Sequence, residues 1–582
     1  MNTIKKFLAL LDSNERSKIA ILFALMFIGM ILETFGIGLV VPLVYVISDP
    51  NSFSNHELFK DTVIANLNHE NLIIACLITM LIVYSLKSIF MSFLVWYRFN
   101  FVFSFQANLS SRIFKIYLKQ PYLFHLKADF SALTQNLIRE TNLLAFYFSI
   151  PLLLIFSEVF VLIGILSFLF IMEPFGCSIL MLIFGVPSYI FNLATKYKIN
   201  HLGQERRIYE VKRLKHAQQG LRAIKEISLL GRQNFLMNLF THNNHGLAKV
   251  EIKENTLQAL PNIWLELLAV VGVIGLAFSM RLKGAHTSEL LASLALFFAA
   301  AMRLIPSLTR LINSWGRVKY SKSAVNTLYT ELCLINSCVE QKKTSHCISF
   351  KKTLRLKDVS FSYPDTSNPV CIKINLTIPF GSLIALVGSS GTGKSTLINI
   401  ILGILSPNQG QVLVDEKNIH LNLREWQDHI GYVPQDIYII DDTLRNNVAF
   451  GLASDEINEQ AVENAIESAQ LTNFITSLPD GLDTLLGENG CRLSSGQRQR
   501  LGIARALYHN PSILFMDEGT SALDANTGQE IMRVIDAMRG NKTVVIVTHN
   551  PENAAYCEKL YQLEQGQLKE VEHRTIEEGA MQ

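Results

Sequence analysis

The chain has 582 residues, more than one domain usually contains, and is 49% hydrophobic but only 17% charged. Its formal net charge of +3 is too small to indicate a nucleic acid partner. The apolar excess lies before about residue 316, and the remainder has the composition of a soluble α/β domain. The sequence therefore predicts a membrane domain followed by a soluble one.

Six apolar stretches in the first part are long enough to cross a membrane, whose hydrocarbon core of about 30 Å takes about 20 helical residues. They run over 19–47, 72–97, 143–172, 174–197, 258–281 and 287–312. Basic residues concentrate before the first stretch and in the two long connections, 98–142 and 198–257. By the positive-inside rule, both termini and both connections are expected in the cytoplasm. The connections are polar but helix-permissive, so we expect the membrane helices to continue through them into water.

Ionisable residues inside these stretches are candidates for the transport path, because charge in lipid is costly and usually faces a cavity. They are Glu33, Lys87, Glu158, Glu266, Arg303 and, near the end of its stretch, Arg310. Arg303 and Arg310 are seven residues apart and so share a helix face. Because arginines suit bidentate phosphate contact, Lys87, Arg303 and Arg310 form a candidate anion site. The alternative is that these cations pair with glutamates such as Glu33 or Glu266.

Residues 317–352 show no strong apolar period and are predicted to be a solvated linker before a soluble domain over 353–582. In that domain an apolar run, 383–387, precedes a phosphate-binding loop of the form G-x4-G-K-S, and a helical pattern follows it. The backbone of the loop and the helix N-terminus are expected to hold ATP phosphates. The residues are Gly388, Ser389, Ser390, Gly391, Thr392, Gly393, Lys394, Ser395 and Thr396. Lys394 is expected to neutralise the phosphates, and Ser395 to bind Mg²⁺.

Two further apolar runs end in residues with the chemistry of ATP hydrolysis. The run 513–516 is followed by Asp517, a candidate Mg²⁺ ligand, and Glu518, a candidate general base. The run 543–547 is followed by Thr548 and His549, and the order of the strands directs this histidine toward the nucleotide.

The full set of motifs resembles the ATP-binding cassette (ABC) family. Leu493-Ser494-Ser495-Gly496-Gln497 resembles its LSGGQ signature, Gly431-Tyr-Val-Pro-Gln435 its Q-loop, Ser521-Ala-Leu-Asp524 its D-loop and Phe361-Ser-Tyr363-Pro its adenine-stacking loop. Residues 484–490 resemble a segment by which exporter cassettes contact the membrane domain. These motifs occur in family order within about 190 residues.

The resemblance implies a role for each matching residue. Tyr363 would stack on adenine, Gln435 would contribute to Mg²⁺ binding and catalysis, and Asp524 would belong to the nucleotide site. Ser494, Ser495, Gly496 and Gln497 of one chain would close over the ATP bound by Lys394 of another, so two chains would form two ATP sites. A homodimer is therefore expected, with the cassette in the cytoplasm.

Two residues depart from the family pattern. Ser495 replaces the usual second glycine of the signature, and Gly519 replaces the usual alanine after the glutamate. A serine would slow closure if the backbone there had positive φ or lay against phosphate. Because Glu518, His549 and Gln435 are present, the site is predicted to be active.

The order of membrane domain, linker and cassette resembles exporter half-transporters, which implies a type IV exporter fold: an all-α six-helix membrane domain over 1–316 and an α/β P-loop domain. Short transverse helices are expected near 120–127 and 219–230. Three membrane segments resemble the bacterial lipid-linked oligosaccharide flippases: Glu33-Thr-Phe with Leu39-Val-Val-Pro42, the stretch 261–266, and Arg303-Leu-Ile-Pro-Ser-x-x-Arg310. The expected cargo is then a polyprenyl-pyrophosphate sugar, flipped across the bacterial inner membrane.

Other functions stay open. The flippase resemblance implies a basic residue near the start of the fifth stretch, but Asn262 occupies this position, so a full belt of positive charge is not expected. The alternatives are export of a peptide or amphipathic drug, because the fold does not select a substrate, and an ATP-driven regulator that moves nothing.

Overall fold

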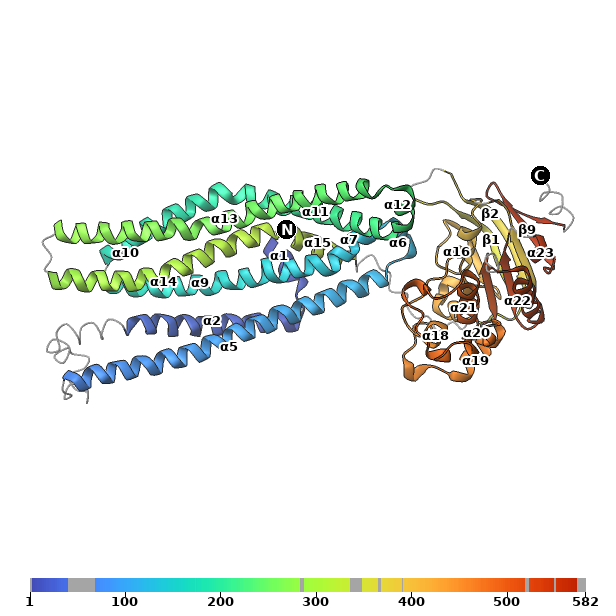
Figure 1. Cartoon of the computed structure of the whole chain (residues 1–582), viewed down its shortest axis with the longest axis horizontal. Coiled ribbons are helices and arrows are strands. Elements are labelled where there is room, and N and C mark those ends of the chain that lie inside the picture. The colour runs from blue at the N-terminus through green and yellow to red at the C-terminus, as the bar shows by residue number, and fades with distance from the viewer. Residues whose placement is uncertain are drawn as a thin grey trace. The chain divides into compact units, whose positions relative to one another are not determined.

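The computed structural model describes residues 3–39, 69–172, 174–282, 287–334, 348–364, 368–389, 391–518, 523–548 and 551–572. The chain divides into two compact units. The first comprises Met1–Gln120 and Phe124–Val339, and the second comprises Pro121–Leu123 and Glu340–Gln582. The first consists of long helices and the second combines helices with two sheets (Figure 1).

Helices joined by short turns make up the described residues of the first unit. Its α-helices are α1 (Thr3–Leu10), α2 (Ser13–Gly38), α5 (His69–Leu118), α6 (Tyr122–Lys127), α7 (Phe130–Gln135), α8 (Thr141–Leu143), α9 (Ile150–Met172), α10 (Pro174–Leu180), α11 (Val186–Arg222), α12 (Ile224–Leu230), α13 (Gln233–Leu282), α14 (Thr287–Tyr320) and α15 (Lys322–Cys333). Wider π-helical turns join some of them, over Asn136–Glu140, Leu144–Ser149 and Met181–Gly185. Short helices α6 and α12 lie where transverse helices are predicted.

Within the described residues, five helical segments are long and apolar enough to cross a membrane: Ser13–Gly36, Ile73–Leu118, Phe130–Ile171, Cys177–Arg222 and Gln233–Gly275. They correspond to the first five predicted stretches, although residues 40–47 of the first lie outside the described part. The sixth stretch, 287–312, lies in α14. Helices α5, α11 and α13 continue far beyond their apolar parts, as the helix-permissive connections predict.

Large apolar side chains point outward along the membrane helices. Leu81 and Ile89 on α5 are each 69% exposed, and Ile171 at the end of α9 is 76% exposed. Such surfaces are unfavourable in water but match hydrocarbon, while the helices satisfy their own backbone groups.

A buried charge network joins the extended part of α11 to the π-turn at Asn136–Glu140. Arg206 contacts Glu210 at 2.7 Å (Nη1 to Oε2) and Glu140 at 3.4 Å (Nη2 to Oε1). All three side chains are buried, and the more exposed Arg139 adds a second contact to Glu210 at 3.0 Å. Removing one member of such a buried network would leave an uncompensated charge. The network therefore fixes how α11 packs against the π-turn.

The helical unit extends beyond the boundary predicted at residue 316. Helix α14 runs through Tyr320, and α15 buries Ala324, Val325 and Leu328, the last two in the cluster that also holds Leu10 of α1. The predicted linker, 317–352, is thus partly helical. The apolar stripe of α15 spans only about one helical turn. It is therefore too short to be recognised in the sequence as a helical repeat of apolar residues. Residues 335–347, which include most of its polar part, lie outside the described residues.

The second unit contains two sheets. A four-stranded antiparallel sheet has the order β2-β1-β4-β5, with β1 (Thr353–Phe361), β2 (Cys371–Pro379), β4 (Gln409–Val414) and β5 (Lys417–Asn418). A six-stranded sheet has the order β10-β9-β3-β8-β7-β6, with β3 (Leu383–Val387), β6 (Ile430–Val433), β7 (Ile513–Asp517), β8 (Thr543–Val547), β9 (Lys559–Glu564) and β10 (Gln567–Val571). Only β10 runs antiparallel to its neighbour there.

Helices pack against these sheets and contribute the remaining residues of the apolar core. They are α16 (Lys394–Ile401), α17 (Leu423–Asp428), α18 (Leu444–Val448), α19 (Glu459–Ser468), α20 (Thr472–Thr476), α21 (Ser495–Leu507), α22 (Ala525–Ala537) and α23 (Pro551–Ala554). Alternate residues of β7 enter opposite apolar clusters: Leu514 and Met516 lie in one, Ile513 and Phe515 in the other. The strand is therefore covered on both faces, which explains its unbroken apolar sequence.

Candidate nucleotide site

The phosphate loop, Gln435, Asp517 and Glu518 gather at one edge of the six-stranded sheet. Strands β3, β6, β7 and β8 are parallel, so their carboxyl ends meet at that edge. The phosphate loop follows β3, Gln435 follows β6, Glu518 follows β7 and Thr548 follows β8. His549, Ser390 and Gly519 lie outside the described residues.

Glycines give the phosphate loop its shape. Gly388, Gly391 and Gly393 have φ values of 150°, 84° and 102°, which side chains rarely allow. A Cβ on Gly388 would lie 2.7 Å from the carbonyl oxygen of Leu563, and one on Gly393 would lie 2.5 Å from Cγ1 of Val370. Nothing lies within 4 Å of the corresponding position at Gly391, which leaves the backbone open to a close ligand.

Lys394 is the first residue of α16, and its side chain folds back over the loop. Its Nζ donates to the carbonyl oxygens of Gly388 and Ser389, both at 2.8 Å. Burial lowers the pKa of Lys394, whereas the charges of Glu518 and Asp517 act to raise it. The ammonium group is therefore held beside the loop, where a bound phosphate would supply a negatively charged partner.

Glu518 is held by residues from two other elements. Gln435 Nε2 donates to Glu518 Oε2 at 2.8 Å, and Gln499 Nε2 of α21 donates to the Glu518 carbonyl at 2.8 Å. The φ of Glu518 is +53°, an uncommon backbone conformation that is typical of functional sites. The predicted catalytic pair, Glu518 and Gln435, is thus brought into direct contact.

Gln499 is a site residue that the sequence did not single out. It is buried on a helix whose other buried residues are mostly apolar, such as Leu501 and Ile503. A polar residue on the apolar stripe of a helix is the signal that could have identified it, because buried amides require partners.

Tyr363, which the resemblance predicts to stack on adenine, lies beside α16. Tyr363 OH and Thr396 Oγ1 are 3.2 Å apart, and the Tyr363 ring packs edge-on to Phe361 with centroids 5.1 Å apart. Ser395 lies beside Thr396 in the first turn of α16 and is exposed. The structure therefore places Tyr363 against the helix that begins at the phosphate loop.

The signature residues begin α21. Ser494 is the N-cap, with Gln497 N donating to Ser494 Oγ at 3.2 Å and Ser494 N donating to Gln497 Oε1 at 2.8 Å. Ser495 is the first helical residue, is exposed and does not have positive φ. The serine in place of the family glycine therefore causes no backbone strain. Asp524 caps α22 in the same way, accepting from Thr527 N at 3.1 Å.

In the membrane unit, the candidate substrate cations are paired with glutamates. Glu33 is buried and contacts Lys87 at 3.2 Å and also Arg303. Arg303 Nη1 also donates to Ser307 Oγ at 3.4 Å, and Arg310 Nη2 to the same oxygen at 3.5 Å. The two arginines thus share a helix face, as their spacing predicts.

Arg310 belongs to a second cluster. It contacts buried Glu158 with Nε and Nη2, at 2.6 and 3.2 Å. Arg98, the first residue of the basic connection 98–142, lies within electrostatic range of both Glu158 and Arg310. The structure therefore contains the alternative arrangement, in which the cations pair with glutamates. The glutamates are Glu33 and Glu158. Glu266 instead accepts from Asn262 Nδ2 at 3.0 Å.

Comparison with known proteins agrees with this architecture. Residues 371–521 match the family model described as ABC transporter, and residues 19–305 match that of the ABC transporter transmembrane region. An ATP-dependent lipid A-core flippase of Syntrophus aciditrophicus is 27% identical over 81% of this chain and 77% of its own. One from Photobacterium profundum is 28% identical over 80% of this chain and 79% of its own.

The fold also matches a solved structure. A bacterial Atm1-family ABC exporter with ATP bound has a TM-score of 0.79 at 21% identity, covering 98% of this chain and 97% of that one. The predicted fold class, a type IV exporter with a helical membrane domain and an α/β P-loop domain, is confirmed. Half-transporters of this kind are embedded in membranes and act as dimers that bind and hydrolyse ATP. The chain therefore belongs to the ABC transporter family, as an ATP-driven exporter half-transporter with one membrane domain and one cassette.

Proposed function

We propose that two copies of this chain flip a lipid-linked oligosaccharide, carried on polyprenyl pyrophosphate, to the outer leaflet of a bacterial inner membrane. The termini and cassettes would lie in the cytoplasm, the side that the positive-inside rule favours for the basic connections. The observation that carries the proposal is an excess of positive charge around two buried glutamates in the membrane unit.

The charge excess follows from the pairing. Glu33 has two cationic partners, Lys87 and Arg303, which leaves a net charge of about +1 by formal counting. Glu158, with Arg310 in contact and Arg98 within electrostatic range, leaves about +1 in the same way. A homodimer would hold both clusters twice. The glutamates hold the cations in place but do not neutralise them.

A pyrophosphate can use this excess, whereas a neutral molecule cannot. Charge-assisted hydrogen bonds are worth about 1.5–3 kcal/mol each, and planar guanidinium groups match phosphate oxygens in pairs. Arg303 and Arg310 side chains are 24% and 41% exposed, so both are accessible while their glutamates are buried. A lipid with an anionic head therefore fits the site better than a neutral drug.

The ATP site would drive this movement. Ser395, Gln435 and Asp517 offer hydroxyl, amide and carboxylate oxygens, the hard donors that Mg²⁺ prefers, at the edge of the sheet where the phosphate loop lies. Bound Mg²⁺ would neutralise charge on the β- and γ-phosphates. Lys394 would bind those phosphates, Glu518 would accept a proton from the attacking water, and His549 would contact the γ-phosphate. Ser494 and the backbone near Gly496 would close the site from the second copy, and Asp524 would complete it.

The proposal can be tested by reconstituting the dimer in liposomes with fluorescent lipid-linked oligosaccharide. We expect Arg303→Ala and Arg310→Ala to retain ATP hydrolysis but to lose flipping. Folding should survive because Lys87 still pairs with Glu33, and Arg98 still lies near Glu158. Lys198→Ala, which removes an exposed cation of α11 outside both clusters, is the matched control and should flip normally.

A further variant separates cargo binding from a purely structural ion pair. Glu33→Gln removes the carboxylate but keeps both cations. If the cations recognise phosphate, this variant should keep flipping, whereas a structural pair predicts the same loss as in Arg303→Ala. Normal flipping by both arginine variants would refute the assignment of the site.

The same assay distinguishes other cargoes. The relatives named as lipid A-core flippases favour lipid A-core as a second candidate, so it should be compared with the oligosaccharide lipid. Export of a peptide or dye without lipid flipping would favour the drug or peptide alternative. ATP hydrolysis with no movement of any of these would favour a regulatory role.

A further inference from the structure

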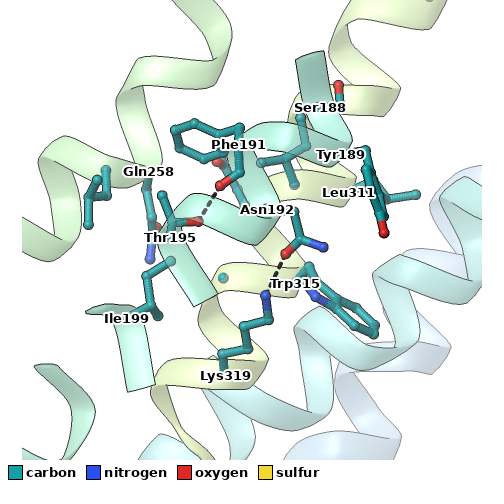
Figure 2. A pocket seen from close by; sticks show the side chains of 14 residues that line it. Ser188, Tyr189, Phe191, Asn192, Thr195, Ile199, Gln258, Leu311, Trp315 and Lys319 are labelled. Carbon is teal, nitrogen blue, oxygen red and sulfur yellow. Dashed lines mark hydrogen bonds between the residues drawn. The ribbon is translucent and has the colours of Figure 1, made fainter. Parts of the chain in front are cut away.

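A cavity of about 270 Å³ lies between α11, α13 and α14 (Figure 2), and no residue of either charge cluster is among those that line it. Its wall combines apolar and polar side chains. Tyr189, Phe191 and Trp315 form much of the apolar part, and Asn192, Asn313 and Lys319 carry polar groups. The cavity is too small for an oligosaccharide but has the volume of a lipid headgroup or a short length of acyl chain.

Lys319 is the cation of this cavity. Its Nζ donates to Asn192 Oδ1, as Figure 2 shows, and the ammonium lies 5.7 Å from the centre of the Trp315 ring. In the described part of the chain no carboxylate pairs with it. Burial lowers the pKa of Lys319 to about 8, with a further contribution from the nearby charge of Lys196. The positive charge of the cavity is thus not balanced by acidic groups.

Glu254 of α13, one turn before the lining residue Gln258, is already engaged by other partners. Glu254 accepts a hydrogen bond from Gln258, a lining residue, and Gln258 accepts from Arg317 Nε at 3.1 Å. The Arg317 charge also reaches Glu254 directly. The described partners of Glu254 are therefore Gln258 and Arg317, and no ion pair joins it to Lys319 within the described residues.

Asn313 provides an independent sign of a missing ligand. Its Oδ1 is buried and has no hydrogen-bond partner among the described residues, yet the residue lines the cavity. Buried polar atoms are normally satisfied, so an acceptor of this kind suits a ligand that carries a hydroxyl group.

The position of the cavity suits a lipid at the membrane surface. Lys319 lies about seven residues, or about 10 Å, beyond the end of the apolar stretch 287–312. Lys196 lies at the end of the stretch 174–197, so both cations fall at headgroup depth. Trp315 and Tyr189 are 42% and 63% exposed, and such aromatic residues are typical of membrane interfaces.

We propose that this cavity binds the phosphate of an anionic membrane lipid, with the phosphate at Lys319, a headgroup hydroxyl at Asn313 and an acyl chain against Tyr189 and Trp315. By the predicted orientation the lipid belongs to the cytoplasmic leaflet. The site is separate from the clusters at Glu33 and Glu158, and the proposal does not depend on which cargo the exporter moves.

The test is lipid retention by the purified dimer, measured by native mass spectrometry with phosphatidylglycerol or phosphatidylcholine of identical chains. Wild type should retain one more phosphatidylglycerol than phosphatidylcholine per protomer. Lys319→Gln should bind phosphatidylglycerol about tenfold or more weakly, the effect of losing one charge-assisted hydrogen bond. The control Lys198→Gln removes an exposed lysine outside the cavity and should bind as wild type does.

ATP hydrolysis by each variant confirms that it is folded. Equal retention of phosphatidylglycerol by wild type and Lys319→Gln, or equal binding of the two lipids by wild type, would overturn the proposal. Polyprenyl pyrophosphate, added as competitor, identifies the source: displacement of phosphatidylglycerol supports a site shared with a transported lipid, and no displacement supports a resident phospholipid. Arg303→Ala should retain phosphatidylglycerol normally, so failure of the flippase proposal stays distinguishable from failure of this one.

Discussion

At the scale of single residues, the position of Glu518 is set by two amide side chains. Gln435 contacts its carboxylate and Gln499 its carbonyl, so both the side chain and the backbone are fixed from outside β7. The carboxylate thus lies at the end of the strand within electrostatic range of Lys394 in the phosphate loop, a position that suits the general-base role we propose for it.

Glu518→Gln should keep ATP binding and lose nearly all turnover, because the amide cannot accept the proton of the attacking water. Removal of a catalytic base typically costs about 10²–10⁴-fold in rate. ATP hydrolysis and nucleotide binding by the purified dimer test this, with Glu463→Gln, an exposed carboxylate of α19, as the control. Turnover within about threefold of wild type would mean that another group is the base.

Ser495 lies on the exposed first turn of α21, in a conformation that needs no glycine. Ser495→Gly should therefore leave the ATP hydrolysis rate within about threefold of wild type, and should lower helix stability by up to about 1 kcal/mol. The rate and the unfolding temperature of the purified protein test this. A large rise in the rate would show that the serine hinders closure of the dimer.

At the scale of helices, Gly203 sets the distance between α11 and the end of α14. A Cβ at this position would lie 2.1 Å from the carbonyl oxygen of Tyr320, a backbone atom that cannot move independently of its helix. The same contact brings Arg206, one turn further along α11, over the Tyr320 ring at 5.7 Å. The close approach therefore supports the buried network of Arg206, Glu140 and Glu210.

Gly203→Ala should destabilise the membrane unit by about 1–3 kcal/mol, the usual cost of overpacking a tight contact. Thermal unfolding in detergent measures this effect. The matched control is Gly275→Ala on α13, where no atom lies within 4 Å of the added Cβ and alanine should be neutral or stabilising. Equal unfolding temperatures for the two variants would contradict the packing argument.

At the scale of the whole molecule, one cassette per chain supports the proposal that each ATP site is shared between two copies. Lys394 begins α16 and Ser494 caps α21, so they belong to two different helices of the same cassette. In the proposed dimer each would act on a different ATP. A substitution of Lys394 or Ser494 in one chain should then disable only the ATP site to which that residue contributes. The second ATP site of the dimer should stay intact.

Mixing Lys394→Ala chains with Ser494→Arg chains should therefore recover part of the ATP hydrolysis that neither variant has alone. In a heterodimer one site contains both substitutions and the other contains none. Hydrolysis by separately tagged, co-purified dimers measures the recovery. The homodimers of each variant are the controls, and full hydrolysis by a strict monomer would refute the shared site.

The sequence by itself determined the cassette chemistry and the membrane class. The loop at Gly388–Ser395 and the pair Asp517–Glu518 are readable because phosphate binding and water activation need these residue types at fixed local spacing. Apolar stretches of sufficient length identify membrane helices because hydrocarbon leaves few alternatives. These patterns are local, so they can be recognised without knowing which distant residues pack together in the fold.

Only the tertiary structure decided how distant residues pair. Arg303 pairs with Glu33, which is 270 residues away in the sequence, and Arg310 pairs with Glu158, which is 152 residues away. No local sequence pattern predicts such contacts. The same holds for the electrostatic interaction of Arg98 with Glu158, the hydrogen bond from Gln499 to Glu518 and the cavity at Lys319, each of which combines separate elements. Charge and polarity can be read from sequence, but whether a charge is neutralised depends on which helix packs beside it.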